Sequence, residues 1–166
     1  MHKGRKPLIL EGARQVGKTW LLKEFGKREY RKLAYVSCDN NPQIAGLFYD
    51  FDTERLIRAL SAITGVHITP GDTLIVLDEV QEVPPAITAL KYFQEDAPDF
   101  HIAVAGSLPG MLIHGGSGFP VGKTESLTLH PLSYGEFLMA TGNGQLLEAL
   151  GEHHFEELNA IQQPVR

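Results

Sequence analysis

Short runs of apolar residues alternate with longer amphipathic segments along most of the 166-residue chain. In residues 74–77 four large apolar side chains follow one another, which is typical of a strand that is buried on both faces. In residues 53–64 the apolar positions recur at the helical period instead, and Gly65 provides a stop. The same criteria predict strands at residues 7–11, 33–37, 74–78, 102–105 and 125–129. They predict helices at residues 17–27, 43–50, 53–64, 84–95 and 134–140.

This alternation of strands and helices predicts an α/β fold with a parallel five-stranded sheet. Right-handed connections place the carboxyl ends of all strands at one edge, where ligands bind in such sheets. The length suits one domain, which we expect to span residues 1–166 with its core at 7–140. A helix rich in leucine and glutamate is expected at 145–162, either within this domain or at the start of a truncated second region. The glycine-rich residues 108–124 are expected to form a loop with one helical turn.

The segment Gly12-Ala-Arg-Gln-Val-Gly-Lys-Thr19 has the spacing of a phosphate-binding loop. It stands between an expected strand and an expected helix, which is the context that this loop requires. A glycine-rich turn without that function is the alternative. Gly12 and Gly17 permit backbone conformations that a Cβ disfavours, so that N–H groups of the loop can form an anion site at a helix N-terminus. Lys18 would reach the β- and γ-phosphates, and the Thr19 hydroxyl would bind Mg²⁺. The residues expected to contact the nucleotide are Gly12, Ala13, Arg14, Gln15, Val16, Gly17, Lys18, Thr19 and Trp20.

Polar residues also stand at the carboxyl ends of two further expected strands. Asp78 and Glu79 end the apolar run, and Ser107 follows the next strand along the chain. We expect Asp78 to hold Mg²⁺ against the Thr19 hydroxyl, and Glu79 to act as general base for the water that attacks the γ-phosphate. Capping of the following turn is the alternative for both acids. Ser107 either contacts the γ-phosphate or the attacking water, or is an ordinary loop serine. The expected catalytic residues are therefore Glu79, Lys18 and Ser107, and the expected metal ligands are Thr19 and Asp78.

Charge and composition narrow the classes of partner. The formal net charge is −5, which argues against a nucleic-acid-binding surface. No apolar run reaches the length of about 18 residues that a membrane span needs. Cys38 is the single cysteine, so an intrachain disulfide is impossible, as fits a reducing compartment. We therefore expect a cytoplasmic protein that binds neither nucleic acid nor membranes, with Cys38 as a small buried apolar residue.

Three segments together resemble the AAA-type branch of the P-loop ATPases. They are Gly12–Thr19, the strand end Leu74–Gln81 and Ala105-Gly-Ser107. More narrowly, the last two and the segment Leu129–Leu138 are similar to a bacterial and archaeal family. Its members join an N-terminal AAA-type ATPase domain to a C-terminal domain of uncharacterised function. The segment Leu-His-Pro-Leu-Ser-Tyr-Gly-Glu-Phe-Leu138 is similar to that family's Pro-Leu-Ser-Phe-x-Glu-Phe signature. The resemblance covers residues 7–140.

The resemblance implies the sheet order 5-1-4-3-2 and ATP as ligand. It also implies the roles given above for the loop and the two acids, with Ser107 as a polar sensor. Members of the family tend to have Gly-Arg before the fifth strand, where this chain has Gly122-Lys123. A lysine cannot reproduce the planar fork of a guanidinium, so the presence of an arginine finger stays open. Family members are about twice as long, so this chain resembles a fragment or a truncated member.

Three functions are compatible with these residues. The first is an ATPase whose Mg²⁺-dependent hydrolysis of ATP drives a conformational change in a protein partner, in further copies of the chain or in a missing domain. The second is a nucleotide-dependent binding switch with negligible turnover. The third is a small-molecule kinase, which would need an arginine-rich lid, whereas beyond Arg58 the only arginine is Arg166. We rank them in this order because the pair Asp78-Glu79 favours hydrolysis.

Overall fold

The computed structural model describes residues 5–107, 120, 122–145 and 147. The chain divides into two compact units, Met1–His130 and Pro131–Arg166, which we describe separately. Most of the loop expected at 108–124, and most of the helix expected at 145–162, lie outside the described residues.

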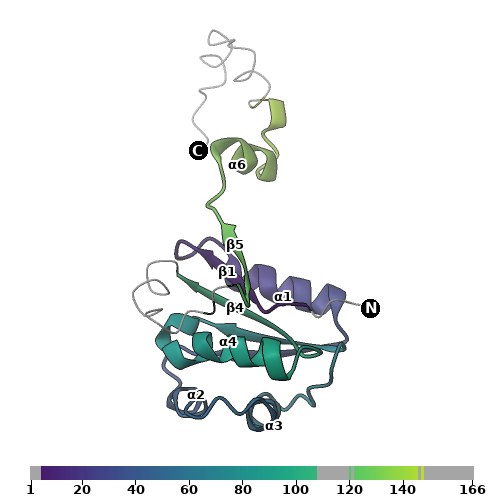
Figure 1. Ribbon diagram of the computed structural model, residues 1–166. Helices are drawn as coiled ribbons and strands as arrows, with labels where there is room; N and C mark the ends of the chain where they lie inside the picture. Colours follow the sequence, from purple (N-terminus) through teal and green to yellow (C-terminus); the bar gives the residue numbers. More distant parts are fainter. Residues whose placement is uncertain (1–4, 108–119, 121, 146, 148–166) are drawn as a thin grey trace. The chain divides into compact units, whose positions relative to one another are not determined.

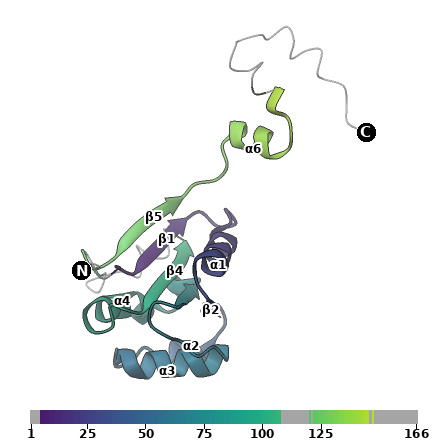
Figure 2. The ribbon, with the colours of Figure 1, turned by 90° about the vertical axis from the view of Figure 1, so that its right-hand side faces the viewer.

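The first unit contains a parallel five-stranded sheet (Figures 1 and 2). Its strands are β1 (Leu8–Gly12), β2 (Lys32–Ser37), β3 (Thr73–Asp78), β4 (His101–Ser107) and β5 (Glu125–Leu129). Their spatial order is β2-β3-β4-β1-β5, which is the predicted order read from the other end. The prediction of a parallel α/β sheet is therefore confirmed.

Helices cover both faces of this sheet. The helices of the first unit are α1 (Lys18–Glu29), α2 (Pro42–Ala45), α3 (Thr53–Thr64), the short 3₁₀ helix η1 (Val80–Glu82) and α4 (Pro84–Asp96). Figure 2 shows α1 on one side of the sheet and α2, α3 and α4 on the other. Each side has its own apolar cluster, and β3 supplies both: Leu74 and Val76 pack on the α1 side, Ile75 and Leu77 on the opposite side. This double burial explains the uninterrupted apolar run in β3.

Local capping sets the limits of α3 where the sequence predicted them. The side chain of Asp52 accepts a hydrogen bond from the N–H of Arg55 at the start of the helix, and Gly65 ends it with a φ of 67°. Such an Asx cap and a left-handed glycine are the usual signals of helix start and end.

The helix expected at 43–50 is wrong over most of its length, because α2 ends at Ala45. The guanidinium of Arg55 explains the early end. It donates hydrogen bonds to the carbonyl of Leu47 and to the carboxylate of Asp50. These groups are thereby held in a turn, in which Phe51 has a φ of 57°. Here a hydrogen bond from a side chain to the backbone eight residues earlier overrides the local helical pattern.

The second unit contains α6 (Tyr134–Ala140), at the predicted position. Ser133 and Glu136 form a reciprocal capping box at its start, with each side chain bonded to the backbone N–H of the other residue. Among the helices that the structure describes, none has the length and apolar character needed to cross a membrane.

Candidate functional site

Three predicted site residues are the last residues of three neighbouring strands. Gly12 ends β1, Asp78 ends β3 and Ser107 ends β4. The sequence predicted Asp78 at the end of its strand and Gly12 and Ser107 just beyond theirs, but in β1 and β4 the backbone pairing continues further than the apolar runs do. Because β4 lies between β1 and β3, these residues share the carboxyl edge of the sheet. Gly12 and Ser107 are direct partners in the pairing of β1 with β4.

The segment Gly12–Thr19 contains three residues with positive φ: Gly12 (154°), Gln15 (63°) and Gly17 (96°). At Gly12 a Cβ would lie 2.2 Å from the carbonyl oxygen of Leu129 in β5, so the neighbouring strand itself requires glycine. At Gly17, the N-cap of α1, the space is open, and glycine is favoured by the left-handed backbone alone. The first turn of α1 adds N–H groups without intrahelical partners and the positive end of the helix dipole. These features fit an anionic phosphate.

Lys18 brings a buried positive charge to this loop. The residue is 6% exposed, and its Nζ donates hydrogen bonds to the carbonyl oxygens of Gly12 (3.1 Å) and Ala13 (2.6 Å). A buried ammonium needs such partners. Phosphate oxygens would be stronger acceptors than the two neutral carbonyls, so the chemistry at Lys18 fits a nucleotide.

Asp78 joins the loop to the end of β3. One of its carboxylate oxygens, Oδ2, accepts hydrogen bonds from the hydroxyl of Thr19 (2.7 Å) and from that of Tyr35 (2.9 Å). The other, Oδ1, accepts from the backbone N–H of Glu79 (3.1 Å). The hydroxyl and carboxylate that the sequence predicted as metal ligands are thus in direct contact, although they are 59 positions apart. Oxygen donors of this kind are what Mg²⁺ prefers.

Glu79 and Ser107 are connected through Gln81. The side-chain amide of Gln81 donates to Oε2 of Glu79 (2.5 Å) and accepts from the backbone N–H of Ser107 (3.3 Å). Glu79 itself has a left-handed backbone, with a φ of 52°, which is uncommon for a residue with a side chain. The structure therefore places the predicted base and the predicted sensor in one hydrogen-bonded chain.

Two members of this network, Tyr35 and Gln81, carried no predicted role. Tyr35 stands opposite Val76 in the pairing of β2 with β3, so it shares a sheet face with Asp78, two residues further along β3. Strand alternation would have identified it once the register was known. Gln81 lies within the segment that carries the family resemblance, but only the turn after Glu79 directs it back toward β4.

Negative charge dominates the surroundings of Asp78. Burial, followed by the hydrogen bond to Asp78 and its charge, raises the pKa of the Tyr35 hydroxyl well above its ordinary value. Burial, followed by the charges of Asp78 and Glu79, raises the pKa of the Cys38 thiol to about 12. Cys38 therefore stays a protonated, buried side chain, and the thiolate that a nucleophile needs is suppressed. A bound cation would relieve this concentration of charge.

The remaining loop residues lie at the surface to different degrees. Ala13, Arg14, Gln15 and Trp20 are exposed, and Val16 is half-buried. Among the described residues, no cluster of three or more His, Cys, Asp or Glu side chains could hold a metal ion. The oxygen donors at this edge that could contact an ion are the Thr19 hydroxyl and the Asp78 carboxylate.

Lys123 lies at the opposite edge of the sheet. It stands two residues before β5, whose first residue pairs with the first residue of β1. Its ammonium is 3.1 Å from the carboxylate of Glu95, at the end of α4. Within this chain, Lys123 is thus placed away from the carboxyl edge that holds Lys18.

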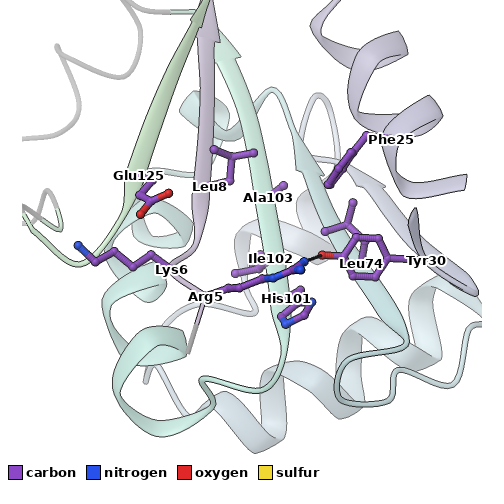
Figure 3. A pocket seen from close by; sticks show the side chains of 10 residues that line it. All are labelled: Arg5, Lys6, Leu8, Phe25, Tyr30, Leu74, His101, Ile102, Ala103 and Glu125. Atoms are coloured by element: carbon purple, nitrogen blue, oxygen red, sulfur yellow. Dashed lines mark hydrogen bonds between the residues drawn. The ribbon is translucent and has the colours of Figure 1, made fainter. Parts of the chain in front are cut away.

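A cavity of about 640 Å³ also lies at the amino ends of the strands (Figure 3). Its floor includes Leu8 and Ala103, and Tyr30 and His101 contribute aromatic rings. The guanidinium of Arg5 donates to the hydroxyl of Tyr30 at 3.3 Å. None of the predicted site residues lines this cavity.

The comparison with known protein families agrees with this geometry. The sequence matches the AAA domain over residues 4–138. The chain belongs to the AAA family of P-loop ATPase domains. Nucleotide binding by an ATPase-like domain is therefore the function of its class.

The fold has a solved counterpart in a Walker-type ATPase of Pyrococcus abyssi, with a TM-score of 0.52 and 15% sequence identity. The match covers 96% of this AAA chain and 55% of that protein, so the chain spans about half of its length. No curated protein matches the sequence. The narrower resemblance, to the family with a C-terminal domain of uncharacterised function, stays a prediction.

Proposed function

We propose that this AAA domain binds ATP together with Mg²⁺ at the carboxyl edge of its sheet and hydrolyses it. The observation that carries the proposal is the 2.7 Å contact between the Thr19 hydroxyl and the Asp78 carboxylate, beside the buried ammonium of Lys18. In this proposal the cation site at Thr19 and Asp78 adjoins the anion site at Lys18, as a magnesium nucleotide requires.

Each residue of the edge has a distinct task in this proposal. The loop from Gly12 to Thr19, together with Trp20 just beyond it, contacts the nucleotide, and the backbone N–H groups of the loop face its phosphates. Lys18 neutralises the β- and γ-phosphate oxygens. Thr19 and Asp78 hold Mg²⁺, which when bound stabilises the charge that develops between the β- and γ-phosphates.

Hydrolysis requires a base for the attacking water, and we assign this role to Glu79. The water forms a bond to the γ-phosphorus, the bond from that phosphorus to the β–γ bridging oxygen breaks, and Glu79 accepts the proton from the water. The products are ADP and inorganic phosphate. Ser107, at the end of the adjacent strand β4, contacts the γ-phosphate or the water.

The test compares ATP turnover and nucleotide affinity in the wild type and in Glu79→Gln. We expect the variant to bind ATP as tightly as the wild type and to lose turnover by a factor of about 100 or more, since it lacks the base. Glu82→Gln is the matched control, because Glu82 is exposed and lies three residues away. Lys18→Ala should weaken ATP binding. Unchanged ATP affinity in Lys18→Ala would show that the site is assigned wrongly.

Nucleotide-dependent binding with negligible turnover is the second candidate. The position of Lys123 favours it, because the residue that stands for the family's arginine forms an ion pair with Glu95 away from the carboxyl edge. Tight ATP binding with no turnover in either the wild type or Glu79→Gln would support this alternative. In both cases the nucleotide acts on a protein partner, on further copies of the chain or on a region beyond this AAA domain, and a cytoplasmic location fits each.

A further inference from the structure

Gln81 is a buried amide with both ends engaged. The residue is 5% exposed. The NH₂ group faces the carboxylate of Glu79 and the carbonyl oxygen faces the N–H of Ser107. Only this orientation satisfies both neighbours, because a carboxylate cannot donate and an N–H cannot accept. The residue is therefore fixed by two directional contacts, one to Glu79 directly after β3 and one to Ser107 at the end of β4.

The backbone that carries Gln81 is equally constrained. It belongs to η1, whose first residue, Val80, is fully buried. Val83, directly after η1, is 2% exposed, and its N–H donates to the carbonyl of Val80. This anchored turn brings the amide back past Glu79 toward β4. A side chain on such a support holds its contact more firmly than one on an open loop.

We propose that Gln81 is a positioning residue that ties the carboxylate of Glu79 to the end of β4 at Ser107. The hydrogen bond from the Gln81 amide occupies Oε2 of Glu79 and leaves the other carboxylate oxygen to accept the proton from water. It also makes the position of the base depend on the position of the strand end that carries the predicted sensor. This inference rests on the hydrolytic function proposed above.

The role predicts a specific kinetic pattern. Misplacing a base by about 1 Å costs on the order of 100-fold in rate, whereas nucleotide affinity depends on the loop and on Lys18, which Gln81 does not touch. Loss of the amide should therefore lower kcat and leave the dissociation constant for ATP unchanged. Loss of a residue that only stabilised the fold would reduce the fraction of folded protein, and would thereby lower the apparent kcat and raise the apparent dissociation constant for ATP.

The experiment uses Gln81→Met, which keeps the length and burial of the side chain but removes both hydrogen bonds. Gln43→Met is the matched control, because Gln43 is exposed on α2. We measure kcat, ATP affinity and hydrogen exchange of the Ser107 amide in the full chain. For Gln81→Met we expect kcat to fall about 10- to 100-fold, ATP affinity to stay the same and exchange at Ser107 to accelerate. If Gln81→Met does not fold, Gln81→Asn replaces it, because the asparagine side chain is too short to span both partners. The same results are expected for that variant.

The outcomes separate the two proposals. A wild type without turnover contradicts hydrolysis. Exchange at Ser107 then decides the inference: acceleration supports the tie and unchanged exchange overturns it. If the wild type is active, an unchanged kcat in Gln81→Met overturns the positioning role even though hydrolysis stands.

Discussion

Replacing Gly12 by alanine tests whether the phosphate-binding loop is shaped by the sheet as well as by its ligand. Gly12 is the last residue of β1 and pairs with Leu129, the last residue of β5. An added Cβ would lie 2.2 Å from the carbonyl oxygen of Leu129, where side-chain carbons essentially never come within 3.0 Å. Because the obstructing atom belongs to the backbone of a strand, no side-chain rotation can relieve the overlap.

The cost has two parts. The backbone at Gly12 has a φ of 154°, a conformation that costs a residue with a Cβ about 1–3 kcal/mol. Forcing β5 away adds a penalty of the kind seen for overpacking, about 1–3 kcal/mol. The free energy of unfolding should therefore fall by about 2–6 kcal/mol in Gly12→Ala.

Gly17→Ala is the matched control within the same loop. Gly17 has a φ of 96°, but no atom lies within 4 Å of the position of a Cβ. Only the backbone term applies there, about 1–2 kcal/mol.

Thermal unfolding followed by circular dichroism measures the difference between the two variants. In a domain of this size each kcal/mol lowers Tm by about 2–4 °C, so the extra cost of about 1–3 kcal/mol from β5 should make Gly12→Ala unfold about 2–12 °C below Gly17→Ala. Equal Tm values for the two variants would refute the argument that β5 imposes glycine at position 12.

Two further predictions concern Tyr35 and His101. Tyr35→Phe removes one of the two hydrogen bonds to Oδ2 of Asp78. We therefore expect the free energy of unfolding to fall by about 1.5 kcal/mol and the Mg²⁺ concentration needed for half-maximal ATP binding to rise. An unchanged Mg²⁺ titration would contradict the supporting role of Tyr35. Burial and, to a smaller extent, the charge of Arg5 lower the pKa of His101, whereas the charge of Asp99 acts in the opposite direction. As pH falls below about 6.5, His101 therefore binds a proton in the unfolded chain before it does so in the folded chain. Stability should therefore decline below that pH, and His101→Asn should reduce the decline in urea unfolding measured at several pH values; an equal decline in both proteins would contradict this assignment.

Most of the sheet could be predicted from the sequence because burial on both faces leaves a strong local signal. The apolar run of β3 needs no knowledge of its neighbours to be recognised as a central strand. The spacing from Gly12 to Thr19 is similarly local, since the turn and the helix start are encoded within eight residues. The order of the strands came from resemblance rather than from pattern, because connection rules alone allow several orders.

The rest depended on contacts between distant positions. The early end of α2 follows from the guanidinium of Arg55, eight residues away from the carbonyl that it binds. The contact from Tyr35 to Asp78 spans 43 positions and depends on the register of two strands. No periodicity in the sequence records such a register.

The register that places Tyr35 beside Asp78 is itself set by the core. In β2, Ala34 and Val36 face the cluster formed with α3 and α4, while Leu33 and Tyr35 face the α1 side. A shift by one residue would exchange these faces, moving Ala34 and Val36 from the buried cluster to the half-buried α1 side and Leu33 and Tyr35 into the buried cluster. It would also turn the Tyr35 hydroxyl away from the carboxylate that meets Thr19. The same burial pattern that stabilises the sheet therefore determines which hydroxyls reach Asp78, so that the predicted metal ligands are positioned by apolar packing on both faces rather than by the loop alone.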